Sequence, residues 1–163
     1  MDAPGRDERR NDFDFLIGRW HVRHRRLTER LVACTEWQEF DGRSTLHPLM
    51  NGLGNVDDNL IELPSGSYRA VTLRSCDPKT GLWAIWWLDA RDPHRIDTPM
   101  KGRFESDGVG RFHADETFNG RPIRVRFLWS DITSASCRWQ QAFSPDGGKT
   151  WETNWIMNFT RLA

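Results

Sequence analysis

Hydrophobic and polar residues alternate along most of this chain, in short stretches that turn-forming residues interrupt. Alternation places every second side chain on one face, which is typical of a half-buried β-strand. After residue 17, no segment shows a sustained run of apolar positions at helical spacing. The pattern predicts an all-β protein of about ten strands. The eleven stretches that indicate strands are residues 19–27, 35–40, 43–50, 59–63, 68–74, 82–89, 100–105, 111–118, 123–129, 137–143 and 150–161.

Turn signals between these stretches predict how the strands connect. Asp41-Gly42 and Asn119-Gly120 predict tight hairpins, because these residue types accept positive φ. Short connections make sequential strands antiparallel neighbours. An open meander of this size would leave two edges free to pair with other molecules, and closure removes both. We therefore expect a closed antiparallel up-and-down barrel, with a two-sheet sandwich as the alternative. About ten strands enclose more space than the roughly eight-stranded barrels that side chains fill, so we also expect an internal cavity.

Composition separates a short tail from one domain. Residues 1–12 are polar and include Pro4 and Gly5, which predicts a disordered tail. Phe13, Phe15 and Leu16 then follow too closely for a solvated loop, so we expect a short N-terminal helical plug over the core. The length of 163 residues suits a single domain, which we place at residues 13–163.

Gly18-Arg19-Trp20 opens the first predicted strand and Arg161 lies near the end of the last, a combination that resembles the lipocalin and calycin barrels. In those families the Trp closes the floor of the barrel and the Arg stacks across it. Residues 13–20, 77–83 and 138–144 are also similar to an uncharacterised bacterial family of lipocalin-like barrels, a domain of unknown function. The resemblance implies a calycin-type barrel and a structural role for this pair. It implies no agreed activity, and no catalytic residue follows from it.

Charge and cysteine content limit the classes of partner. The chain carries 23 Lys and Arg against 23 Asp and Glu. Zero net charge argues against nucleic acid or an anionic membrane, because phosphate binding needs a basic surplus. No apolar run approaches the ~20 residues of a membrane span, and residues 1–10 are charged rather than apolar, unlike a secretory signal. Three widely spaced cysteines without a C-x-x-C pair suggest reduced thiols, so we expect a cytoplasmic protein.

Residues 144–151 match the pattern S-x-D-x-G-x-T-W of the Asp-box hairpin, which occurs in sialidases and other β-proteins. Asp bonds backbone N–H groups in such a turn, and glycine supplies positive φ. The pattern occurs once here, whereas in sialidases it repeats away from the active site. We therefore expect a stable turn rather than glycosidase chemistry.

Aromatic residues dominate the composition, with nine Trp, nine Phe and one Tyr. The most apolar stretch, residues 82–89, carries Trp83, Trp87 and Asp89 on one face and Trp86 on the other. One of these faces must look inward. Asp89, at the end of the strand, is a candidate acid whose pKa would be raised at the mouth of a cavity. The alternative is that Asp89 caps the following loop or pairs with Arg91.

Two later strands alternate arginine or glutamine with aromatic residues. Arg126 alternates with apolar neighbours, and Arg138 and Gln140 flank Trp139. If this polar face lines the barrel, its arginines favour an anionic ligand through bidentate bonds to a carboxylate. The alternative places the arginines on a solvated outer face. Asn154 on the last strand shares this ambiguity.

The histidines do not have the pattern of a metal site. His21 and His24 would point to opposite faces of one strand, and His47, His94 and His113 are isolated from other ligand types. No phosphate-binding, dinucleotide or nucleophile motif occurs. We therefore expect no metal and no cofactor, with haem ligation by a single histidine as an alternative.

These features predict a barrel that binds a small, partly apolar or aromatic molecule, with a carboxylate if the arginine face lines the cavity. The expected ligand residues are Trp86, Trp87, Arg126, Arg138, Trp139, Gln140, Asn154 and Trp155. The alternative is a cofactor-independent lyase, isomerase or cyclase acting on such a molecule, with Asp89, His94 or His113 as the acid or base. A carbohydrate-binding domain is a third option. The expected partner is the small molecule, and base rates alone favour a homodimer.

Overall fold

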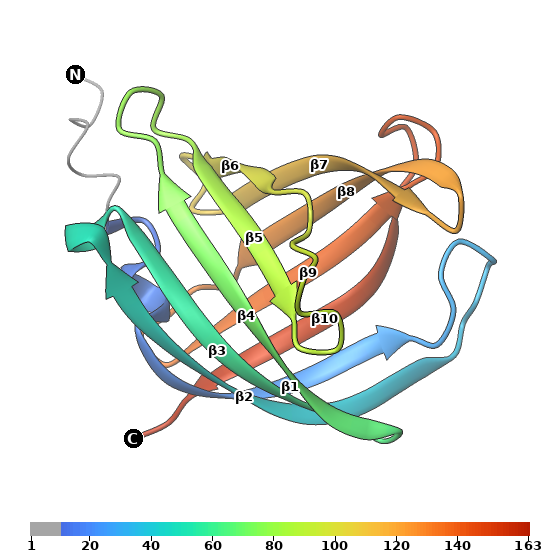
Figure 1. Ribbon diagram of the computed structural model, residues 1–163, viewed down its shortest axis with the longest axis horizontal. Helices are drawn as coiled ribbons and strands as arrows, with labels where there is room; N and C mark the ends of the chain where they lie inside the picture. The colour runs from blue at the N-terminus through green and yellow to red at the C-terminus, as the bar shows by residue number, and fades with distance from the viewer. Residues whose placement is uncertain (1–10) are drawn as a thin grey trace.

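A computed structural model describes residues 11–163. Its ten strands form one closed barrel, whose course Figure 1 shows. The strands are β1 (Gly18–Leu27), β2 (Trp37–Leu49), β3 (Gly54–Leu63), β4 (Gly66–Cys76), β5 (Trp83–Asp89), β6 (Met100–Phe104), β7 (Gly110–Phe118), β8 (Arg121–Ser130), β9 (Ser136–Ser144) and β10 (Glu152–Arg161). The 3-10 turns η2 (Asp14–Leu16) and η3 (Met50–Gly52) precede β1 and β3. No described helix is long and apolar enough to cross a membrane.

The barrel closes through a pairing between its first and last strands. β1 and β10 run antiparallel, with Trp20 opposite Arg161 in register. All other pairings join strands that are consecutive in the sequence. The strands form one closed sheet, so the predicted antiparallel barrel is confirmed and the sandwich alternative is wrong.

Asp41-Gly42 does not form the predicted hairpin. The two stretches that it was expected to separate are one continuous strand, β2, and the count of strands falls accordingly. A Cβ atom on Gly42 would lie 2.7 Å from Nε2 of His24 and 2.7 Å from the backbone oxygen of Leu60. The glycine therefore serves the close approach of a ring from β1 rather than a turn.

Asn119-Gly120 does form the predicted turn, between β7 and β8. The φ angles of the two residues are 48° and 77°. A two-residue hairpin of this kind needs positive φ at both positions, which Asn and Gly tolerate best. The same dipeptide chemistry thus has different outcomes at positions 41–42 and 119–120, because neighbouring strands decide whether a turn is needed.

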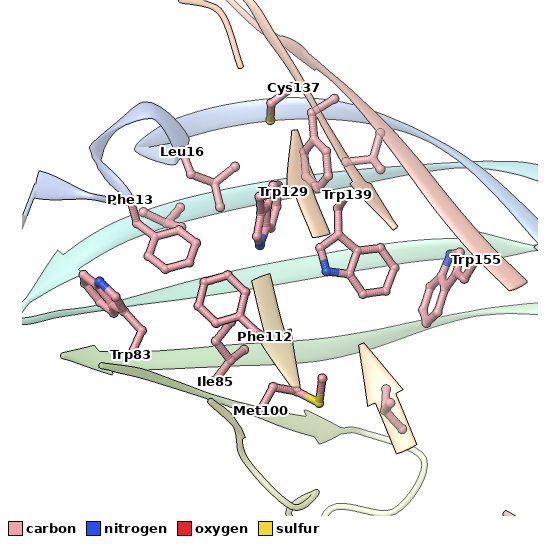
Figure 2. Close-up of a cluster of buried hydrophobic side chains, with 14 of the residues drawn as sticks. Phe13, Leu16, Trp83, Ile85, Met100, Phe112, Trp129, Cys137, Trp139 and Trp155 are labelled. Atoms are coloured by element: carbon pink, nitrogen blue, oxygen red, sulfur yellow. The ribbon is translucent and has the colours of Figure 1, made fainter. Parts of the chain in front are cut away.

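The segment before β1 closes one end of the barrel. Phe13 and Leu16 are 1% and 2% exposed, and Figure 2 shows them above Trp83 and beside Trp129. Among the described residues this segment holds the single 3-10 turn η2 and no longer helix, so the predicted helical plug is not shown. Residues 1–10 of the predicted tail lie outside the described residues. Asp12, at its end, accepts a hydrogen bond of 3.0 Å from the indole N–H of Trp83.

Arg161 holds this N-terminal segment against the barrel floor. Its guanidinium carbon lies 4.2 Å from the ring centroid of Trp20, so the predicted stacking of this pair is confirmed. The guanidinium nitrogens also donate to the backbone oxygens of Phe15, Ile17 and Ser134, at 2.7, 2.5 and 2.9 Å. One side chain from the last strand therefore joins the floor of the barrel to the segment that covers it.

Candidate functional site: a cavity inside the barrel

The barrel encloses a cavity of about 390 Å³. Its wall includes residues of the β1–β2 and β5–β6 connections, among them Arg30, Arg95 and Asp97. In Figure 1 these connections lie away from the N-terminal segment, so the cavity reaches the surface at the opposite end of the barrel. Pockets of roughly 300–1,000 Å³ hold small-molecule ligands. The predicted internal cavity is confirmed, and its size suits a ligand of one to three rings.

Three of the predicted ligand residues, Trp87, Trp139 and Trp155, come together in the cavity wall. The ring of Trp155 meets the other two edge to face, with centroids 6.3 Å from Trp87 and 5.4 Å from Trp139. Figure 2 shows Trp139 and Trp155 projecting into the interior. The aromatic face of these strands is therefore the inner one, which decides the choice that alternation left open.

The arginine and glutamine face of β8 and β9 is consequently the outer one. Arg126, Arg138 and Gln140 are not among the described residues that line the cavity, and neither is Trp86 on β5. The guanidinium carbon of Arg126 lies 4.5 Å from the ring centroid of Trp151, which is also absent from the wall. The structure does not bring these four predicted residues to the cavity.

Asn154 lies behind the wall, at a β-bulge between Thr153 and Trp155. It is fully buried, and its Oδ1 accepts a hydrogen bond of 2.9 Å from Nε2 of the wall residue Gln141. A bulge re-aims the side chain it carries. Asn154 thus positions Gln141, and any contact of its own with a ligand stays a prediction.

The three predicted acid or base residues are dispersed. Asp89 lines the cavity, whereas His94 and His113 are not part of its wall. His113 lies on β7 with its ring centroid 6.0 Å from that of Trp151, and burial lowers its pKa. Metal ligation has no support in the described residues, which contain no group of three or more suitable side chains. The structure therefore assembles no site from these three residues, and their catalytic role stays a prediction.

The pKa of Asp89 is lowered, not raised as predicted. Arg91 donates to its carboxylate from Nη2 at 2.7 Å, from Nε at 3.0 Å and from the backbone N–H at 2.8 Å. These bonds favour the charged form, which lowers the pKa of Asp89. The guanidinium carbon of Arg91 also lies 3.5 Å from the ring centroid of Tyr68. Asp89 thus holds Arg91 against Tyr68 at the mouth of the cavity.

Arg26 is a cavity residue that the sequence analysis missed. It follows Trp20, Val22 and His24 at two-residue spacing on β1, so alternation alone could have placed it inside. Its guanidinium carbon lies 4.6 Å from the ring centroid of Trp155. No described residue forms an ion pair with it, and its Nε is buried without a hydrogen-bond partner. Burial lowers the pKa of Arg26 to about 10, which leaves it charged at neutral pH.

Next to Arg26, His24 contributes an uncharged ring to the wall. Burial, and then the charge of Arg26, lower the pKa of His24 to about 3. Its Nδ1 accepts a hydrogen bond from the indole N–H of Trp155, and its ring stacks on Phe40 with centroids 4.7 Å apart. His24 is therefore neutral over the physiological range and leaves Arg26 as the local charge.

Arginines outnumber carboxylates in the described wall of the cavity. The wall contains Arg26, Arg30, Arg43, Arg74, Arg91 and Arg95 against Asp89, Asp97 and Glu116. Arg91 and Arg95 pair with Asp89 and Asp92, both at 2.8 Å or less, and burial raises the pKa of Asp97. Burial thus works against the charged form of Asp97, while the arginines of the wall outnumber its carboxylates.

A buried ion pair lies deeper in the barrel, between β3 and β4. Nη1 of Arg74 is 2.8 Å from Oδ2 of Asp57 and donates to Oδ1 of Asn55 at 3.0 Å. Oδ1 of Asp57 accepts from the side chain of Asn59 and from the backbone N–H of Thr72. The charges of this pair balance, so the deep end of the cavity is polar without net charge.

The β9–β10 turn is built around Asp146. Its carboxylate accepts hydrogen bonds from the hydroxyls of Ser144 and Thr150 and from the backbone N–H groups of Lys149 and Thr150. The indole N–H of Trp151 donates to the backbone oxygen of Gly148 at 3.1 Å. These bonds account for a stable turn, while its identification as an Asp-box stays a prediction.

Comparison with known proteins supports the fold. The S-type phycobiliprotein lyase CPES from Guillardia theta superposes with a TM-score of 0.59 and 10% sequence identity, over 99% of each chain. At this identity the likeness shows a shared fold and nothing about activity. No protein-family model and no curated protein sequence matches the chain. Membership of the bacterial family of unknown function therefore stays a prediction.

Proposed function

We propose that the protein binds a small, partly aromatic molecule that carries a carboxylate, inside the barrel cavity. The observation that carries this proposal is Arg26, a charged guanidinium in the wall that has no carboxylate partner among the described residues. A charge removed from water without a partner costs free energy, and a partner relieves that cost. A carboxylate matches the planar donor fork of an arginine through two parallel hydrogen bonds, and it occurs on many aromatic small molecules.

The body of the ligand would contact the aromatic wall. Trp87, Trp139 and Trp155 offer ring faces and edges to the cavity. Aromatic pairs contribute about 0.5–1.5 kcal/mol beyond the burial of their area. Because Arg26 already lies over the ring of Trp155, a carboxylate at Arg26 would place the attached ring beside these indoles.

Binding of a matched pair of probes tests this proposal. 4-Benzylbenzoate has two aromatic rings and a carboxylate, and its methyl ester has the same shape without the charge. We expect the acid to bind at least about tenfold more tightly than the ester, since hydrogen bonds to charged groups contribute about 1.5–3 kcal/mol. Isothermal titration calorimetry at neutral pH measures both dissociation constants.

Two arginine variants make the test specific to the cavity. Arg26→Met keeps apolar contact with Trp155 and removes the charge, so it should abolish the preference for the acid. Arg25 is the next residue on β1, on the outer face, with its guanidinium carbon likewise 4.6 Å from a ring centroid, that of Trp37. Arg25→Met is therefore the matched control and should leave the preference unchanged. If Arg26→Met retains the preference, the proposal is wrong.

An enzymatic function is the second candidate, and Asp97 is the observation that favours it. Its carboxyl lines the cavity, and burial raises its pKa, as a proton donor requires. The structurally similar protein is named a lyase, which supports the idea that such a barrel can have an enzymatic function. Here the reaction would be a cofactor-independent lyase, isomerase or cyclase step on the carboxylate ligand, with Asp97 in the place that the sequence analysis gave to Asp89, His94 or His113.

Deuterium exchange tests this second candidate without knowledge of the substrate. Phenylpyruvate is an aromatic carboxylate with an acidic benzylic position, and NMR in D₂O follows the loss of its protons. A general acid or base typically accelerates proton transfer by about 10²–10⁴-fold. Exchange should be faster with the protein than in buffer and should slow in Asp97→Asn but not in Asp92→Asn. Exchange at the buffer rate would exclude this role.

A further inference from the structure

Trp129 on β8 has an indole N–H without an acceptor. The residue is 3% exposed and lines the cavity, and its Nε1 is buried with no hydrogen-bond partner. Four other indoles have one, since Trp20, Trp83, Trp151 and Trp155 donate to Leu16, Asp12, Gly148 and His24. A buried donor left unpaired costs free energy, so the isolation of this N–H calls for an explanation.

The side chains in ring contact with Trp129 are three phenyl rings and one guanidinium, none of which is a strong hydrogen-bond acceptor. The rings of Phe13, Phe15 and Phe159 have centroids 6.3, 5.8 and 5.3 Å from its own. The guanidinium carbon of Arg74 lies 5.8 Å from the same ring. Its neighbours are thus apolar rings and a further donor.

Arg74 adds a second unpaired donor at the same place. It is 3% exposed, lines the cavity, and has its Nε buried without a partner although its Nη1 is paired. Trp139, directly opposite Trp129 in the β8–β9 register, turns its indole into the same interior in Figure 2. We call Arg74, Trp129 and Trp139 the inner donor cluster. Phe13 contacts both Arg74 and Trp129, which places the cluster at the closed end of the cavity.

The described carboxylate paired with Arg74 is Asp57, and its oxygens are already engaged. Asp57 already accepts from Arg74, Asn59 and the backbone of Thr72. Because Asp57 balances the charge of Arg74, a second anion at this depth would be buried without a counterion, which is unfavourable. The cluster therefore suits a neutral acceptor.

We infer that the inner donor cluster binds a carbonyl oxygen of the same ligand whose carboxylate contacts Arg26, so that the ligand class is an aromatic oxo acid. This inference rests on the proposed function, because the carboxylate at Arg26 fixes one end of the molecule. The carbonyl then lies near Nε of Arg74 and Nε1 of Trp129, which have no acceptor among the described residues. A ketone or ring carbonyl adds this acceptor without adding charge.

A pair of probes that differ at one group tests the inference. 4-Benzoylbenzoate carries a ketone where 4-benzylbenzoate has a methylene, and the two are otherwise the same. In the wild-type protein we expect the ketone to bind about tenfold more tightly, since a buried hydrogen bond adds roughly that much to an equilibrium constant. Calorimetry measures both dissociation constants. If 4-benzoylbenzoate and 4-benzylbenzoate bind equally well, the inference is wrong, and buried water rather than a ligand carbonyl accepts from these donors.

Variants locate the effect. Trp129→Phe and Trp139→Phe each keep an aromatic ring and remove one N–H, so each should reduce the ratio of the two affinities, ketone over methylene, whatever it does to the affinity for 4-benzylbenzoate itself. Trp37→Phe, outside the cavity wall, is the control for loss of an indole. If neither cavity variant reduces the preference, the cluster is not the carbonyl site. Failure of the proposed function is distinct, because it appears as loss of the acid-over-ester preference at Arg26.

Discussion

The indole N–H of Trp155 on β10 donates a hydrogen bond of 3.1 Å to Nδ1 of His24 on β1. The bond crosses the seam at which the barrel closes, because β1 and β10 are the first and last strands. It requires Nδ1 to be an acceptor, so the ring proton resides on Nε2. A second proton on His24 would break the bond and place a charge beside Arg26. The pairing therefore ties closure of the barrel to the protonation of one histidine.

His24 should make stability depend on pH. Its pKa is about 3 in the folded protein, against the ordinary 6.5 expected for the unfolded chain. Between these values the unfolded chain binds more protons, so stability falls as the pH drops from 6.5 toward 3. The slope from this one group is at most about 1.4 kcal/mol per pH unit. Urea unfolding at several pH values from about 7 to 5 should show a shallower slope in His24→Gln than in wild type.

The comparison with His24→Gln isolates the histidine from the carboxylates. Asp89 and Asp107 have lowered pKa values in the folded protein. Their contributions to stability are therefore lost only below about pH 5, as the pH falls toward these lowered pKa values. His47→Gln, at an exposed position, controls for removal of an imidazole. Identical slopes in wild type and His24→Gln would show that His24 is not the group that links pH to folding.

Arg161 should be essential to the closed end of the barrel. Arg161→Met removes three hydrogen bonds to backbone oxygens and the stacking on Trp20. We expect a loss of about 3 kcal/mol, from charge-assisted bonds and a cation–π contact of about 0.5–2 kcal/mol. Urea denaturation measures this loss. Arg19→Met, at an exposed arginine of β1 whose side chain donates to the backbone oxygen of Ala163, should change stability by less than about 0.5 kcal/mol. Similar values for the two variants would contradict the role of Arg161.

The ion pair of Arg74 and Asp57 should show the cost of an unpaired buried charge. Both side chains are 4% exposed, so Arg74→Met leaves Asp57 without its partner and should cost about 3–5 kcal/mol. The same two strands carry an exposed pair, Arg69 and Asp58 at 3.3 Å. Arg69→Met should cost less than about 1 kcal/mol. If the unfolding free energies of Arg74→Met and Arg69→Met differ by less than about 1 kcal/mol, the buried pair does not have the role given to it.

Asp97 should oppose the binding of a carboxylate ligand whenever it is ionised. It lines the cavity with the arginines, and Asp97→Asn removes a like charge from the approach of the ligand. We expect 4-benzylbenzoate to bind about two- to fivefold more tightly, as a partly exposed charge contributes up to about 1 kcal/mol. Calorimetry on Asp92→Asn, on the same connection but outside the wall, gives the control value. Weaker binding in Asp97→Asn would instead indicate that Asp97 donates to the ligand.

Alternation predicted which residues of a strand share a face but not which face is inner. By periodicity alone, either Trp139 or Arg138 could face the interior of the barrel. Which of them does depends on the side toward which the sheet curls. Arg26 shows the opposite case, since its place after Trp20, Val22 and His24 was sufficient to put it inside. An arginine is normally expected in solvent, and here an indole beneath it makes the inner position acceptable.

The sequence by itself determined the class of the fold and the order of its strands, because these depend on local alternation and turn residues. The stacking of Trp20 on Arg161 followed from the resemblance to the lipocalin and calycin barrels, and closure of the meander makes it possible by joining the first and last strands. Only the tertiary structure decided that Asp41-Gly42 continues a strand, that Arg91 keeps Asp89 ionised, and that Arg26 has no partner. Each of these depends on residues from other strands. The environment of a side chain is a property of the closed barrel, because the sequence of one strand does not specify which side chains of other strands lie against it.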